Sequence, residues 1–239
     1  MSIDLEGIVI IVGNYGSGKT EVSVNLAVNR RREGVDVRVG DLDLVNPYFR
    51  TREAIAPLRE LGIEVVVPPD KYLHADLPIL SPLIGGMIRR PSQLTLLDAG
   101  GDDVGATVLA ALADALDKVQ VRMIQVVNPF RPFTQTVDGC LRIRREIEAA
   151  SRLTISGIIG NANLIDETNA DTICQGYERV SEFASVSGLP LEFITAPVDL
   201  LDKLDVKHFS CPLLPIERQL VPPWKQAVKL GPENFRIRI

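Results

Sequence analysis

Eight consecutive residues near the start of the chain have the types and the spacing that bind a phosphate group. From Gly13 to Thr20 the chain reads Gly-Asn-Tyr-Gly-Ser-Gly-Lys-Thr, which satisfies the pattern G-x-x-x-x-G-K-[ST] in full. Glycines at these places let the backbone turn tightly and point its N–H groups at phosphate oxygens. Lys19 would bring a positive charge to the β- and γ-phosphates, and the Thr20 hydroxyl would coordinate Mg²⁺. The segment is therefore predicted to be a P-loop.

The stretches on either side of this segment also suit a P-loop. An apolar strand, Ile8–Val12, is predicted before it, and a helix, Lys19–Arg32, is predicted after it. The positive end of that helix would face the same anion as the loop. The predicted nucleotide contacts in this region are Gly13, Asn14, Tyr15, Gly16, Ser17, Gly18, Lys19, Thr20 and Glu21.

Acidic residues that follow two other apolar stretches could complete a magnesium site. Asp98 ends the stretch Thr-Leu-Leu-Asp and precedes Ala-Gly-Gly, which is the Walker B arrangement and also has D-x-x-G spacing. Asp41 and Asp43 follow the stretch Val35–Val39 and point the same way if that strand continues. Hydrolysis needs a group that orients or deprotonates the attacking water. The predicted metal ligands are Thr20, Asp98 and Asp41, and the predicted catalytic residues are Lys19, Asp43 and Asp41.

The elements that must position these residues alternate along the chain between β-branched stretches and helical stretches. This alternation predicts a doubly wound α/β fold: a mainly parallel sheet of about seven or eight strands with helices on both faces, as in P-loop NTPases. The predicted strands are Ile8–Val12, Val35–Val39, Glu64–Val67, Gln93–Asp98, Val121–Val127, Ile155–Ile159 and Leu191–Ile194. The predicted helices are Lys19–Arg32, Arg52–Leu61, Ala106–Leu116, Val137–Ala150 and Asp171–Ser187.

No repeat or linker divides the chain, so residues 1–239 are predicted to form a single nucleotide-binding domain. The proline-rich segment Pro68–Arg90 is expected to be the least regular stretch, acting as a lid or a partner-binding loop. Asn128–Phe133 follows a predicted strand at the sheet end where the nucleotide would bind. Its Arg131 could contact a ligand or a client, and a stiff strand-to-helix turn explains its two prolines equally well.

Composition excludes several classes of protein. With 46% hydrophobic and 24% charged residues, the chain is typical of globular proteins, and its net charge of −5 gives no support for nucleic-acid binding. Its three cysteines lie far apart, which argues against a disulfide framework and a cysteine zinc site. No apolar run approaches the length that spans a bilayer, and the N-terminus does not have the pattern of a signal peptide. A cytoplasmic protein without a membrane span is expected.

These motifs together resemble the MinD/ParA-type ATPases, in the class that also holds nitrogenase iron protein, metallochaperone GTPases and dethiobiotin synthetase. The resemblance rests on the P-loop and on five further pieces in the family's order: Asn25-Leu26-Ala27, Asp41-Leu42-Asp43, Asp98-Ala99-Gly100-Gly101, Gly157–Asn161 and Ala196-Pro197-Val198-Asp199. It implies that Asp43 positions the hydrolytic water and that Asp41 lies nearer the metal. It also implies that Asn161 meets the base and that the loop from Pro197 to Asp199 closes over it.

The chain departs from the family inside the P-loop. Many MinD/ParA proteins carry an extra lysine five positions before the invariant one, and that lysine reaches across a dimer to the partner's nucleotide. This chain has Asn14 there, and an amide cannot supply a cation to developing phosphate charge. A homodimer that sandwiches the nucleotides is therefore left as an open possibility.

The sequence also bears on whether the bound nucleotide carries adenine or guanine. GTPases of this class use an N-K-x-D element whose aspartate accepts hydrogen bonds from guanine. Framing this element from Asn161 puts Leu164 in place of the aspartate, and framing it from Asn163 supplies Asp166 but puts Leu164 in place of the lysine. Because neither frame is complete, ATP with Mg²⁺ is preferred to GTP.

The expected function is that of a slow Mg²⁺-dependent ATPase of the MinD/ParA type. Its segments Asp41–Arg52 and Asp98–Gly105 would switch with the nucleotide and change the affinity for an unidentified protein client in regulation, positioning or maturation. Three alternatives stay open: an ATP-dependent small-molecule kinase or ligase resembling dethiobiotin synthetase, a GTP-using metallochaperone, and a nucleotide sensor without turnover. Scarce histidine and scattered cysteine argue against metal delivery.

Overall fold

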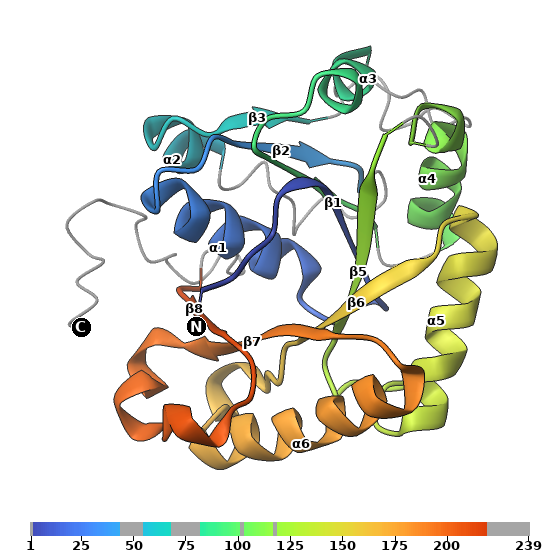
Figure 1. Ribbon diagram of the computed structural model, residues 1–239. Coiled ribbons are helices and arrows are strands. Elements are labelled where there is room, and N and C mark those ends of the chain that lie inside the picture. The colour runs from blue at the N-terminus through green and yellow to red at the C-terminus, as the bar shows by residue number, and fades with distance from the viewer. Residues whose placement is uncertain (1, 44–54, 68–81, 101–102, 117–118, 219–239) are drawn as a thin grey trace.

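The computed structural model describes residues 2–43, 55–67, 82–100, 103–116 and 119–218, which form one sheet and its covering helices (Figure 1). The sheet has eight strands in the order β3-β2-β4-β1-β5-β6-β7-β8, and every neighbouring pair is parallel. The strands are β1 Gly7–Val12, β2 Val37–Asp41, β3 Glu64–Val66, β4 Leu94–Asp98, β5 Val121–Val127, β6 Ile155–Gly160, β7 Leu191–Pro197 and β8 Leu213–Ile216.

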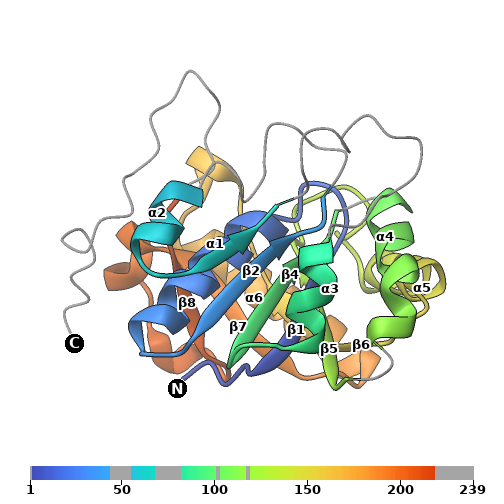
Figure 2. The ribbon, with the colours of Figure 1, turned by 90° about the horizontal axis from the view of Figure 1, so that it is seen from above.

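Helices cover both faces of this sheet, as Figure 2 shows from above. They are α1 Lys19–Arg32, α2 Ile55–Glu60, α3 Pro82–Arg89, α4 Asp103–Leu116, α5 Val137–Ser151 and α6 Ala170–Ser187, with short 3₁₀ turns η3 Ile165–Glu167, η4 Val198–Lys203 and η5 Val206–His208. Helices α1 and α2 lie on one face, and α3, α4, α5 and α6 follow one another across the other. The predicted doubly wound fold is confirmed.

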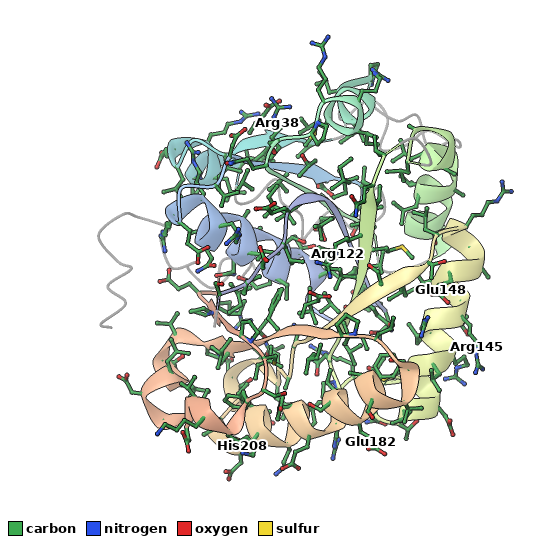
Figure 3. All side chains as sticks on the ribbon, in the orientation of Figure 1. Arg38, Arg122, Arg145, Glu148, Glu182 and His208 are labelled. Carbon is green, nitrogen blue, oxygen red and sulfur yellow. The ribbon has the colours of Figure 1, made fainter. Side chains whose placement is uncertain are left out.

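The core has two sides because successive strand residues point to opposite faces. In β1, Val9 and Ile11 pack with the α1 and α2 side chains, while Ile8 and Ile10 pack with those of α3 and α4. All four are at most 1% exposed, so the strand is a continuous apolar run without alternation. Charged side chains such as Arg145 on α5 and Glu182 on α6 point outward (Figure 3).

Two elements differ from the sequence-based expectation. Strand β8 was not predicted, because Pro212 and Pro215 interrupt its apolar pattern. The structure accommodates Pro215 because β8 is an edge strand, where a missing N–H leaves no partner unpaired. The prediction that Pro68–Arg90 is irregular was wrong for residues 82–89, which form α3, since Pro82 occupies the first helical position and needs no N–H there. Residues 68–81 lie outside the described residues.

Predicted bounds agree closely where the local signal is complete. Helix α1 begins and ends at the predicted residues. Strand β2 continues to Asp41, which was the condition for the Asp41 and Asp43 side chains to point the same way. Helix α6 begins at a capping box made by Asn169 and Thr172 and ends at Gly188 in the left-handed conformation. Among the described helices, none combines the length and apolar character that crossing a bilayer requires.

Candidate nucleotide and magnesium site

The predicted P-loop connects the carboxyl end of β1 to the amino end of α1 in the middle of the sheet. Gly16 and Gly18 have φ of 74° and 89°, the left-handed region that glycine tolerates. Gly18 caps α1 without any side-chain hydrogen bond, so the first N–H groups of this helix are not capped by a side chain. The loop therefore has the backbone geometry of an anion site at a helix N-terminus.

Close packing also requires glycine in this loop. A Cβ at Gly13 would lie 2.5 Å from the Val126 carbonyl oxygen of β5, and one at Gly18 would lie 2.2 Å from the Asn161 amide nitrogen. The Lys19 side chain is 8% exposed, and its ammonium donates to the Asn14 carbonyl at 3.1 Å. The lysine is thus folded back over the loop that it follows.

Asp98 lies beneath the start of α1 and is 1% exposed. Ser23 donates to its Oδ1 at 3.2 Å, and the Thr20 hydroxyl lies near enough to this carboxyl to lower its pKa. Burial raises the pKa of Asp98 to about 6, against the opposing effects of the nearby Thr20 hydroxyl and the Lys19 charge. Two predicted metal ligands, Thr20 and Asp98, therefore meet in the folded chain.

The second oxygen of Asp98, Oδ2, is buried and has no hydrogen-bond partner among the described residues. A buried carboxylate oxygen of this kind is costly unless a cation or a donor satisfies it. The described residues contain no group of three His, Cys, Asp or Glu side chains arranged to hold a metal by themselves. This fits Mg²⁺ beside a nucleotide, because that ion takes one or two protein oxygens and completes its shell with water and phosphate.

Asp41 and Asp43 lie beside Asp98. Asp41 is fully buried and is the register partner of Asp98 in the β2–β4 pair. Its Oδ1 accepts a hydrogen bond of 2.9 Å from the Asp43 backbone N–H, and Asp43 is close enough to raise the pKa of Asp98. The structure thus brings all three predicted acidic residues together at the carboxyl ends of β2 and β4. Their individual roles stay predictions.

Asn161, predicted to contact the base, has a role in the structure that the sequence did not reveal. Its amide nitrogen donates to the Ser17 carbonyl at 2.6 Å, and its amide oxygen accepts from the Thr195 hydroxyl at 2.6 Å. The side chain is 4% exposed and ties the P-loop to β6 and β7. Sequence reasoning missed Thr195, whose only signal is a hydroxyl within the apolar run of β7. Contact between Asn161 and a base stays a prediction.

The remaining predicted nucleotide contacts are spread around the same sheet edge. Tyr15 projects from the P-loop and is 75% exposed. Pro197 ends β7, and Asp199 is an exposed residue of the turn η4 that follows. Glu21 accepts a hydrogen bond from Asn25, one turn further along α1.

The sequence analysis also missed Ser23, the hydrogen-bond donor to Asp98. It could have been found from its position three residues after Thr20 on the same helix face.

Comparison with known proteins gives matches among solved structures only, because no family model and no curated protein matches the chain. The signal recognition particle 54 kDa protein from Aeropyrum pernix, in complex with GDP, is 18% identical with a TM-score of 0.55 over 80% of this chain. FtsY from Thermotoga maritima is 19% identical with a TM-score of 0.57 over 81%, and chloroplast FtsY from Physcomitrella patens is 20% identical with a TM-score of 0.52 over 80%.

The chain spans only part of these proteins: 42% of the Aeropyrum chain, 63% of the Thermotoga chain and 59% of the Physcomitrella chain. At this level of identity, the likeness concerns the fold alone. The structures named here are the signal recognition particle 54 kDa protein and FtsY, so the narrower resemblance to MinD/ParA proteins stays a prediction. The eight-stranded parallel sheet with helices on both faces has the fold of the P-loop NTPases.

Proposed function

We propose that this chain binds a nucleoside triphosphate with Mg²⁺ and hydrolyses it slowly as a switch that acts on a protein client. The observation that carries this proposal is the position of the Thr20 hydroxyl, one residue after the P-loop lysine, beside the buried carboxyl of Asp98. Together, this hydroxyl and this carboxylate supply the kind of oxygen atoms that Mg²⁺ takes beside a nucleotide. Because all described strands belong to one sheet, we further propose that residues 1–239 act as one nucleotide-binding unit.

In the proposed reaction the protein mainly positions groups. The backbone N–H groups of the P-loop and the Lys19 ammonium would hold the phosphates, while Thr20 and Asp98 would hold the metal ion. Bound Mg²⁺ would neutralise charge on the β- and γ-phosphates. Asp43 orients a water whose oxygen bonds to the γ-phosphorus as the bond to the β–γ bridging oxygen breaks. The products are the nucleoside diphosphate and inorganic phosphate.

The switching part of the proposal rests on how the two predicted switch segments begin. The Leu42 N–H donates to the Asp98 carbonyl at 2.8 Å, immediately beyond the end of β2. The segments Asp41–Arg52 and Asp98–Gly105 therefore start side by side, next to the place where the γ-phosphate would lie. Residues 44–54 and 101–102 lie outside the described residues.

A protein partner is proposed at the same edge of the sheet. Large apolar side chains are exposed in the P-loop and in the segments after β5, β6 and β7: Tyr15 at 75%, Phe133 at 66%, Leu164 at 37%, Ile165 at 48% and Val198 at 40%. Ile165 also has φ of 63°, an unfavourable conformation for a β-branched residue and a sign of functional strain. A client or a second copy of the chain would cover these side chains.

ATP is proposed as the nucleotide, with GTP as the second candidate. The only nearby aspartate that could accept from guanine in either frame is Asp166, and its carboxylate forms an ion pair of 3.0 Å with Arg218. This pairing supports ATP, whereas the GDP bound in the similar Aeropyrum structure supports GTP. The deciding experiment is calorimetric titration of the chain with ATP and GTP, each with Mg²⁺ and with EDTA, followed by phosphate release. Failure of both nucleotides to bind with Mg²⁺ would refute the proposed function.

A further inference from the structure

The turn between β5 and α5 is held in one conformation by two buried side chains. Asn128 accepts at its carbonyl from the Arg131 N–H at 3.1 Å and from the Thr134 hydroxyl at 2.7 Å. Its side-chain oxygen accepts from the Phe130 N–H at 3.1 Å. Asn128 and Thr134 are each 1% exposed. The direction in which the Arg131 side chain leaves this turn is therefore set by the fold.

Arg131 leaves the turn toward the P-loop. A Cβ placed on Gly16 would lie 3.6 Å from Arg131 Nε and 3.8 Å from its Cδ and Cζ, so the guanidinium runs along the flank of the loop. The Asn14 amide donates to the Pro132 carbonyl at 3.2 Å and joins the turn to the same loop. Asn14, which stands where the related ATPases carry a second lysine, thus holds an arginine-bearing turn against the P-loop.

The surroundings of this guanidinium suit a bound anion. Among the described residues, no group forms a hydrogen bond with the buried Arg131 Nε. None of the ion pairs among these residues includes Arg131 either. Leaving a buried hydrogen-bond donor unpaired costs free energy. The cost is greater here because the positive charge of the guanidinium lies beside a loop that carries the Lys19 charge and several N–H groups. Phosphate oxygens would satisfy the donor and the charge together, since the guanidinium fork matches their geometry.

We propose that Arg131 acts on the nucleotide of its own chain, as the cation that the missing lysine at position 14 would otherwise supply. The inference rests on the proposed nucleoside triphosphatase function. Arg131 donates hydrogen bonds to oxygens of the γ-phosphate and stabilises the charge that develops as the bond to the β–γ bridging oxygen breaks. The guanidinium acts only as a hydrogen-bond donor, since it has five N–H donors and no acceptor. Hydrolysis then needs no cation from a partner.

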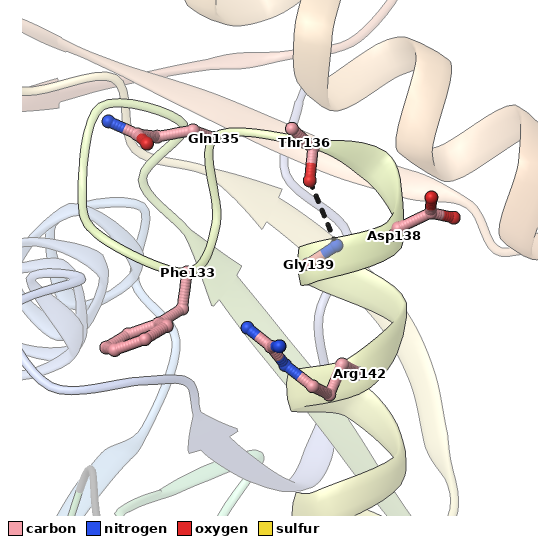
Figure 4. A pocket seen from close by; sticks show the side chains of 6 residues that line it. All are labelled: Phe133, Gln135, Thr136, Asp138, Gly139 and Arg142. Carbon is pink, nitrogen blue, oxygen red and sulfur yellow. Dashed lines mark hydrogen bonds between the residues drawn. The ribbon is translucent and has the colours of Figure 1, made fainter.

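The matched variants are Arg131→Gln, Arg131→Lys and Arg142→Gln. Arg142 is the control because its guanidinium lies 5.7 Å from the centre of the Phe133 ring, on the side of the turn that lines a surface cavity of about 380 Å³ (Figure 4). Arg131→Gln is expected to lower phosphate release by about 10²–10³-fold, the effect of removing one transition-state donor. The affinity for the diphosphate should change by less than roughly threefold, while the tighter binding of diphosphate with aluminium fluoride is lost.

Arg131→Lys should recover part of the rate, and Arg142→Gln should match the wild-type chain. Retained diphosphate binding shows that the variants are folded. An equal loss of rate in Arg142→Gln, or a rate for Arg131→Gln within roughly threefold of wild type, overturns the inference.

Mixing variants distinguishes action within the chain from action across a dimer. Arg131→Gln mixed with Lys19→Ala should show no recovery of phosphate release, and the wild-type rate per molecule should not depend on protein concentration. Recovery on mixing would show that Arg131 acts on a partner's nucleotide and would overturn the proposal. If the wild-type chain releases no phosphate, the proposed hydrolase function fails. The Arg131 contact is then decided by a non-hydrolysable triphosphate: a loss of affinity of about tenfold in Arg131→Gln supports it, and unchanged affinity refutes it.

Discussion

Asp41 and Asp98 are register partners at the carboxyl ends of β2 and β4, and both side chains are buried on the α1 side of the sheet. One residue further on, the Leu42 N–H bonds to the Asp98 carbonyl. The strand that leads to the proposed water-positioning residue, Asp43, is thus joined by backbone hydrogen bonds to the strand that carries the proposed metal ligand. A change in the occupancy of the metal site should therefore alter the position of Asp43.

Asp98→Asn should have opposite effects on the empty and the loaded protein. Without a bound metal ion, as in EDTA, burial raises the pKa of Asp98 from 3.8 to about 6. As pH rises, this carboxyl therefore stays protonated to a higher pH in the folded state than in the unfolded state. The free energy of unfolding therefore falls as pH rises through this window, by up to about 3 kcal/mol. Asn carries no charge, so the variant should have a larger free energy of unfolding than the wild type at about pH 7.5. This difference should be smallest at about pH 4, and urea denaturation at the two pH values measures it.

With Mg²⁺ present, the same variant should bind nucleoside triphosphate more weakly by about tenfold or more, because it loses the charged ligand. An equal stability gain at both pH values would contradict the assignment of the gain to the buried charge.

Asp43→Ala should separate binding from turnover. The carboxylate is proposed to orient water and not to hold the nucleotide, so affinity for the triphosphate should stay within roughly threefold while phosphate release falls by about 10²-fold or more. Lys19→Ala is the contrasting variant and should lose tight binding itself. Hydrolysis by Asp43→Ala at the wild-type rate would remove the assigned role of this residue.

Thr195→Val should loosen the P-loop without changing the shape of β7. The substitution removes the donor to Asn161 and leaves a buried amide oxygen unpaired, which costs about 1–3 kcal/mol. Because Asn161 also holds the Ser17 carbonyl, nucleotide affinity should fall together with stability. Thr154→Val, at an exposed position, serves as the control and should change stability by less than about 0.5 kcal/mol. Equal effects of the two variants would show that the tether has no energetic role.

The three cysteines should differ sharply in reactivity. Burial raises the pKa of Cys140 and of Cys211 to about 11, and both side chains are less than a tenth exposed. At about pH 8 only about one molecule in a thousand would carry either thiolate. Cys174 is only partly buried and should react first with a thiol-specific disulfide reagent, with the other two following after unfolding. Rapid modification of all three in the native protein would contradict this burial.

The sequence by itself determined the features that depend on neighbouring residues. The P-loop pattern, the bounds of α1 and seven of the eight strands follow from residue spacing, because backbone freedom and apolar runs are local properties. The position of Asp98 at a strand end was also readable in this way. These features required no knowledge of which segments meet in space.

Tertiary structure alone decided which distant groups complete the site. Strand β8 carries prolines that local patterns reject, and only its place at the sheet edge makes them acceptable. Thr195 became part of the site because β7 lies beside β6, which puts its hydroxyl against Asn161. Arg131 lies along the P-loop because β5 pairs with β1, so that the turn after β5 ends beside Gly16. The order of strands in a parallel sheet is set by packing over the whole chain, and no local pattern of residues encodes it.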